Sequence, residues 1–211
     1  PFGQWRNTIT LVGDDPYRPE PEDGYGQDRH IEELEESVIS QIPSVFYLRK
    51  LYLPDFPIVE DLSRFGKTRP GVTTALLDQV RQGTLIINFS GHGSPKVWTQ
   101  ERVLTMERDL SRIETGGKLP LWIAATCDWG RFDMIGDRCM AEGLLGLADN
   151  GAIAALSATR LSFLGDNLDY MGEFFNRLFP GEQNVGYSNT LGVAVLASKN
   201  ALTGTNKQRY A

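Results

Sequence analysis

The sequence has few of the residues that form disulfide frameworks or zinc sites. It contains two cysteines and two histidines among 211 residues. Two cysteines are too few for a disulfide-stabilised fold, and the scattered cysteines and histidines do not have the spacing of a structural zinc site. The fold therefore depends on a hydrophobic core, for which 41% hydrophobic residues in a chain of this length are sufficient.

Two further absences narrow the function classes. No apolar run approaches the roughly 20 residues that a membrane-spanning helix requires. The net charge of −6 argues against nucleic acid as the main partner, because nucleic-acid binding needs a basic face. The chain begins with "PFGQWRNTIT", without an initiator methionine or a recognisable signal peptide, so we expect a segment of a longer protein.

Strand and helix patterns alternate along the chain. Apolar, β-branched runs predict strands at 7–13, 45–53, 84–90, 119–127 and 151–159. Amphipathic or apolar patterns predict helices at 28–42, 71–83, 138–149, 168–179 and 188–202. This alternation predicts a single α/β domain over residues 1–211, with a mostly parallel sheet and helices on both of its faces.

Chemically capable residues lie at the ends of three of the predicted strands. Asp14 and Asp15 follow the first, His92 follows the third, and Cys127 is the last residue of the fourth. Because the carboxyl ends of parallel strands meet at one edge of a sheet, we expect these side chains to gather there. An acid, an imidazole and a thiol are the parts of a cysteine nucleophile system.

Each group has a defined task in such a system. The imidazole takes the thiol proton and later protonates the leaving amine. A carboxylate that accepts the other ring N–H fixes the tautomer and orientation of the imidazole. The glycines on both sides of His92, Gly91 and Gly93, allow close approach of the backbone to a substrate, and N–H groups there can bind an oxyanion.

The same residues also have purely structural interpretations. A Gly-His-Gly sequence is compatible with an ordinary turn, a strand-end cysteine such as Cys127 can belong to the core, and the acidic pair before Pro16 can form a turn. We expect Cys139 to lie on a helix and to point into the hydrophobic core, although a disulfide with Cys127 is possible. We expect His30 to be a solvated residue at the start of its helix. The coincidence of three strand ends favours the catalytic interpretation of His92 and Cys127.

Two motifs carry a resemblance to a known family. "NFSGHGS" (88–94) followed by "LWIAATCDWGRFD" (121–133) resembles the gingipain-type cysteine peptidases, family C25, which have a caspase-like fold. The resemblance implies a caspase-like three-layer α/β/α sandwich and a cysteine peptidase that requires no cofactor. "LRKLYLPDFP" (48–57) and "ERVLT" (101–105) resemble the PorU branch of the family. That branch supplies the signal peptidase and sortase of the type IX secretion system.

The resemblance also assigns catalytic roles to residues. His92 matches the catalytic histidine and Cys127 the nucleophile. The backbone N–H groups of Gly93 and Cys127 match the oxyanion hole. Asp15, or else its neighbour Asp14, matches the acid that orients the histidine.

Substrate, metal and partners follow from the same resemblance. Asp28 falls near an acidic residue that determines arginine preference, and Phe163 near an aromatic wall of the same pocket. The acidic stretch "DDPYRPEPED" (14–23) could bind structural calcium, although a solvated loop is favoured. Expected partners are cargo proteins with a C-terminal sorting domain, type IX secretion components and anionic lipopolysaccharide, at the bacterial cell surface. Alternatives are a secreted endopeptidase that degrades external protein, or a non-catalytic caspase-like scaffold.

Overall fold

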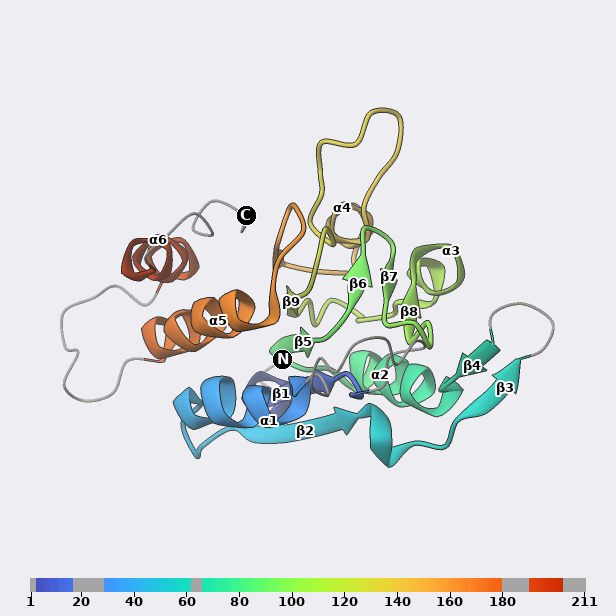
Figure 1. Ribbon diagram of the computed structural model, residues 1–211, viewed down its shortest axis with the longest axis horizontal. Helices are drawn as coiled ribbons and strands as arrows, with labels where there is room; N and C mark the ends of the chain where they lie inside the picture. The colour runs from blue at the N-terminus through green and yellow to red at the C-terminus, as the bar shows by residue number, and fades with distance from the viewer. Residues whose placement is uncertain (1–2, 17–28, 62–65, 180–189, 203–211) are drawn as a thin grey trace, which may run out of the picture.

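A five-stranded parallel sheet in the order β10-β9-β5-β1-β2 forms the centre of the molecule (Figure 1). The computed structural model describes residues 3–16, 29–61, 66–179 and 190–202. The strands are β1 (Thr8–Gly13), β2 (Tyr47–Tyr52), β5 (Ile86–Ser90), β9 (Leu121–Ala125) and β10 (Ala154–Ser157). The middle strands β9, β5 and β1 are buried along their whole length, as their near-continuous apolar sequences predict.

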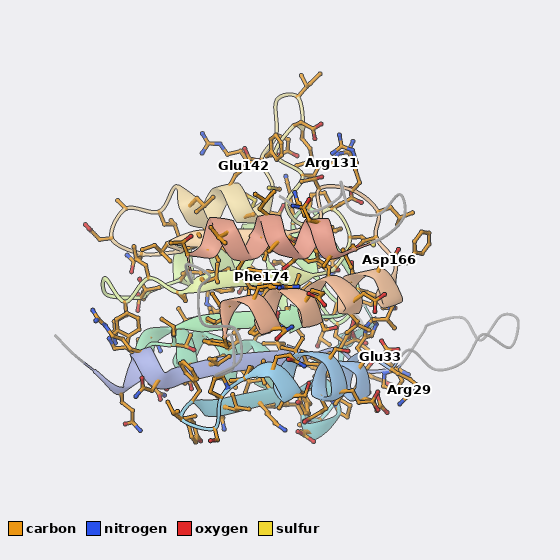
Figure 2. All side chains as sticks on the ribbon, turned by 90° about the vertical axis from the view of Figure 1, so that its left-hand side faces the viewer. Arg29, Glu33, Arg131, Glu142, Asp166 and Phe174 are labelled. Carbon is orange, nitrogen blue, oxygen red and sulfur yellow. The ribbon has the colours of Figure 1, made fainter. Side chains whose placement is uncertain are left out.

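Helices cover both faces of this sheet. One face carries α2 (Pro70–Gln82), α3 (Met106–Asp109) and α4 (Met140–Leu145), and the other carries α1 (His30–Glu33), α5 (Leu164–Leu178) and α6 (Leu191–Ala201). Alternate strand residues point into the two cores: Val12 and Ile87 into the first, and Ile9 and Ile123 into the second. The predicted three-layer α/β/α sandwich is confirmed. Figure 2 shows α5 and α6 side by side over the second core.

All five predicted strands form, each one or more residues shorter than its pattern. The helix predicted at 28–42 is helical in three forms: α1 continues as the π-helix η2 (Leu34–Val38) and the 3₁₀-helix η3 (Ile39–Gln41). Helix α2 ends at Gly83, whose φ of 104° is a conformation that favours glycine. None of the helices in the described ranges combines the length and the apolar character that crossing a bilayer requires.

Two small antiparallel sheets are not predicted from the sequence. One is the pair β3 (Val59–Asp61) and β4 (Gly66–Thr68), and the other contains β6 (Gly93–Ser94), β7 (Val97–Trp98) and β8 (Leu104–Thr105). Strands of two or three residues are too short for hydrophobic alternation to be recognised. The second of these sheets directly follows β5 and shapes the segment that contains His92.

A group of buried aromatic side chains packs against the segment that contains His92. Phe89 of β5 stacks on Trp98 of β7 with ring centroids 4.4 Å apart, and Trp98 lies 5.4 Å from Trp129. Trp122 of β9 completes the group, 5.8 Å from Trp98. All four rings are fully buried. Close-packed aromatic rings resist displacement, so they hold the loops after β5 and β9 in fixed positions.

Candidate active site

The predicted catalytic residues follow three strands that lie side by side. In the sheet, Gly13 of β1 pairs with Ser90 of β5, and Ser90 pairs with Ala125 of β9. The three strands therefore end in register, and the segments that follow them leave the same edge together. Asp14 lies one residue beyond this line, while His92 and Cys127 each lie two residues beyond it.

Asp14 holds the main chain of His92. Its Oδ2 accepts a hydrogen bond from the His92 backbone N–H at 2.8 Å, and its Oδ1 accepts one from the Asp15 N–H at 2.9 Å. A Cβ atom on Gly91 would lie 2.5 Å from Asp14 Cβ and 2.7 Å from Oδ2, so only glycine fits there without displacement. The sequence predicts an acid that orients the imidazole ring, whereas these contacts of Asp14 fix the backbone.

Cys127 is the accessible one of the two cysteines. It is half-buried, and its Sγ donates to the Ser162 carbonyl at 3.2 Å and lies 3.5 Å from the Ser162 N–H. Cys139 is fully buried in the first core, as predicted, and burial raises the pKa of its thiol. Both cysteines are free, so the possible disulfide between them is not formed.

The strand pairing orients the backbone of Gly93, one of the two predicted oxyanion donors. The Thr99 N–H donates to the His92 carbonyl at 2.9 Å, which makes Gly93 and Trp98 a non-hydrogen-bonded pair of the β6–β7 ladder. The Gly93 N–H is therefore directed away from β7. A Cβ atom on Gly93 would lie 2.6 Å from Thr126 Oγ1, so this glycine packs against the residue that precedes Cys127. The two predicted donor segments thus lie against each other.

A buried group of three carboxylates, one of which is Asp14, lies next to the backbone of His92. Oxygens of Asp14, Asp15 and Glu101 lie within 4.8 Å of one another, and Arg69 forms an ion pair of 2.7 Å with Asp15. Burial raises the pKa of Asp14 well above its ordinary value and also raises that of Glu101. Burial thus disfavours negative charge on Asp14 and Glu101, and the guanidinium of Arg69 compensates the charge of Asp15.

Neither Glu101 nor Arg69 is predicted as a site residue from the sequence. Glu101 belongs to "ERVLT", a segment whose resemblance to one branch of the family indicates no role for the glutamate itself. Thr99 and Arg102 on both sides of it have φ values of 61° and 54°, a left-handed conformation that is uncommon for residues other than glycine. Strained backbone of this kind gathers at functional sites, and this geometric signal is not visible in the sequence.

The carboxylate group does not fit a calcium site. Calcium takes six to eight oxygen ligands, whereas both oxygens of Asp14 accept backbone N–H groups and the cation Arg69 already pairs with Asp15. Residues 17–23 of the acidic stretch proposed for calcium lie outside the described residues. No step of the chemistry is assigned to a metal.

His30 lies in the site rather than on the surface. The prediction of a solvated His30 is wrong: the residue is 4% exposed. Its ring meets the His92 ring edge to face, with centroids 5.0 Å apart and an angle of 87° between the planes. Helix α1 begins at His30, at the sheet edge where β5 ends, which turns a residue in a charged stretch inward. The only two histidines of the chain are thus in contact.

Of the two predicted substrate-binding residues, Phe163 and Asp28, the structure describes only Phe163. Phe163 is exposed, and it follows Ser162, whose backbone contacts the Cys127 thiol. Its role as an aromatic wall of the substrate pocket stays a prediction. Asp28 lies outside the described residues.

Comparisons with known proteins agree with this architecture. The family model of peptidase family C25 matches residues 1–211. Among solved structures, the Arg-specific cysteine proteinase gingipain R is 16% identical with a TM-score of 0.68, covering 97% of this chain and 44% of that chain. The complex of the pro- and mature domains of RgpB from Porphyromonas gingivalis is also 16% identical, with a TM-score of 0.65 and coverage of 94% and 44%. A structure described as a protease has 14% identity, a TM-score of 0.66 and coverage of 100% and 47%.

These solved structures show the fold, and the chain spans less than half of their length. No curated protein matches the sequence. The family model, by contrast, extends over every residue of the chain, including both motifs that contain His92 and Cys127. The chain belongs to peptidase family C25.

Proposed function

We propose that the protein is a cysteine endopeptidase in which Cys127 is the nucleophile and His92 the general acid and base. The observation that carries this proposal is the register of β1, β5 and β9, which places the segments of Asp14, His92 and Cys127 next to one another at one sheet edge. Active sites of open parallel sheets lie at this edge. The half-buried Cys127 beside the well-supported His92 loop is consistent with a reactive thiol.

The mechanism is acyl transfer. His92 accepts the Cys127 proton, the thiolate attacks the backbone carbonyl of the substrate, and the carbonyl oxygen becomes an oxyanion. We assign the stabilisation of that oxyanion to the backbone N–H groups of Gly93 and Cys127. His92 then gives its proton to the departing amine, which leaves a thioester on Cys127. Attack by water on the thioester gives hydrolysis, and attack by an amine gives transpeptidation.

Within this chemistry, we propose the role of signal peptidase and sortase of the type IX secretion system. The enzyme would remove the C-terminal sorting domain of secreted cargo and transfer the new carboxyl terminus to anionic lipopolysaccharide. Support comes from the resemblance of "ERVLT" (101–105) to the PorU branch. Glu101 of this segment is buried, and its carboxylate lies close to that of Asp14, which holds the backbone of His92. This role implies an extracytoplasmic location at the bacterial surface.

A secreted endopeptidase that degrades external protein is the second candidate. The fold likeness to gingipain R, an Arg-specific cysteine proteinase, favours it. The first half-reaction is the same in both candidates, so the arrangement of Cys127 and His92 does not separate them. A third candidate, a non-catalytic scaffold, needs neither the thiol nor the imidazole.

Substrate selectivity separates these candidates. We expect the protein to cut a cargo protein at the junction with its C-terminal sorting domain and to leave denatured casein intact. Mass spectrometry of the products identifies the cleaved bond, and a product joined to an added amine reveals transpeptidation. Degradation of casein at many bonds would favour the second candidate. The absence of cleavage in both substrates would favour the scaffold.

A further inference from the structure

Four large apolar side chains are exposed on the two loops that hold the Cys127 sulfur. Phe132 and Ile135 lie on the loop after β9, and Leu161 and Phe163 on the loop after β10; we call them the apolar rim. Each is more than half exposed, and Ile135 is completely exposed. Isolated exposed apolar residues are ordinary, but four on two joined loops beside a reactive group indicate a binding surface.

The two loops are joined to each other. Arg160 and Asp133 form a two-pronged ion pair with contacts of 3.0 and 2.5 Å. The Asp128 N–H donates to the Arg160 carbonyl at 3.2 Å. Phe132 and Leu161 are the chain neighbours of this ion pair, so they are brought to the same part of the surface. The ion pair and the hydrogen bond therefore join the two loops that carry the rim residues.

The charges around the rim are mostly paired. Two aspartates of the loop after β9 are paired, Asp133 with Arg160 and Asp137 with Lys96 at 2.8 Å. Arg131 and Arg138 are also exposed on this loop. Figure 2 shows Arg131 on the part of the molecule that projects beyond the helical layers. Asp128 lies on the same loop, and Lys96 also lies 3.8 Å from Glu107, so the charges of the loop and its partners nearly balance.

We propose that the apolar rim binds large apolar side chains of the polypeptide substrate beside the cleaved bond. This inference rests on the proposed function and names its substrate class. The substrate is the occupant that fits, because both loops are attached to the nucleophile segment: Ser162 contacts Cys127 Sγ, and Leu161 and Phe163 flank Ser162. Phe132, Ile135 and Leu161 thereby join Phe163 as specificity-determining residues.

Paired peptides test the preference. The substrates are quenched fluorescent peptides in which the residues around a central bond are varied. We expect kcat/KM to be at least about tenfold higher for peptides with large apolar residues next to the bond than for peptides with serine or asparagine there. Ile135→Ser and Phe132→Ser should each reduce that preference several-fold. Ile153→Ser is the matched control, because Ile153 is also 69% exposed but precedes β10 at the opposite edge of the sheet.

A binding experiment keeps this test independent of turnover. The Cys127→Ala protein is titrated with an acetylated peptide that contains two leucines and two glutamates, and with the same peptide in which serines replace the leucines. We expect about tenfold tighter binding of the leucine peptide, and loss of this difference in the Cys127→Ala/Ile135→Ser protein. Fluorescence anisotropy measures both dissociation constants.

The outcomes separate this inference from the proposed function. Cys127-dependent cleavage without apolar preference, or equal effects of Ile135→Ser and Ile153→Ser, overturns the inference and leaves the peptidase intact. Failure to cleave any peptide overturns the proposed function. In that case the binding experiment alone tests the inference, and equal binding of the leucine and serine peptides overturns it. The inference is also overturned if the Cys127→Ala protein binds phosphatidylcholine vesicles but does not bind the leucine peptide.

Discussion

Replacing Cys127 with alanine is expected to abolish peptide-bond cleavage, with a fall in kcat of roughly 10³-fold or more. The reason is that the thioester cannot form without the sulfur, whereas substrate binding uses other groups. Cys127 is half-buried and contacts the backbone of Ser162, so its truncation should leave the fold intact. Single-turnover kinetics with the sorting-domain substrate measure the loss, and circular dichroism verifies the fold.

Cys139→Ala is the matched control for this variant. Cys139 is fully buried and belongs to the first core, so its truncation should lower the free energy of unfolding without removing turnover. Cleavage that persists in Cys127→Ala but disappears in Cys139→Ala would contradict the assignment of the nucleophile.

Replacing Gly91 with alanine is the second change with a large expected effect. The added Cβ would lie 2.5 Å from Asp14 Cβ and 2.6 Å from the Phe89 ring, and both neighbours are buried. Overpacking of this kind costs about 1–3 kcal/mol of unfolding free energy. Displacement of Asp14 also loosens its hydrogen bond to the His92 N–H, and a shift of about 1 Å in a catalytic group can lower kcat by about 10²-fold.

Gly165→Ala provides the comparison, because Gly165 lies in α5 and a Cβ there meets no atom within 4 Å. This substitution should stabilise the protein slightly, since alanine favours helices over glycine. Urea denaturation and kcat measurements on both variants test the contrast. If Gly91→Ala retains full activity, the hydrogen bond from Asp14 does not position His92.

The layered fold could be predicted from the sequence because long, fully buried strands have a strong local signal. The run "TLIINFS" (84–90) has four large apolar residues among its seven, and it forms the middle strand β5. The amphipathic helix at 71–83 was equally visible, and its end at Gly83 follows from glycine's freedom at positive φ. The two-residue strands around His92 have no such signal, and their pairing depends on the packing of Trp98.

The candidate site was predictable in part. Strand-end position alone placed His92 and Cys127 at a common edge, because parallel topology forces strand ends together. The inward turn of His30 and the burial of Glu101 beside Asp14 were not predictable. Both depend on contacts between segments far apart in the sequence, and charged or polar residues are ordinarily solvated.

The central claim is that His92 and Cys127 act as one chemical unit, and the alkylation rate of Cys127 tests it most directly. Iodoacetamide reacts with thiolates, so a neighbouring imidazole that accepts the thiol proton accelerates the reaction. Peptide mass spectrometry follows both cysteines, with the buried Cys139 as an internal reference. We expect labelling of Cys127 in the unmodified protein and at least about tenfold slower labelling in His92→Ala. Equal labelling rates of Cys127 in the two proteins would contradict the account.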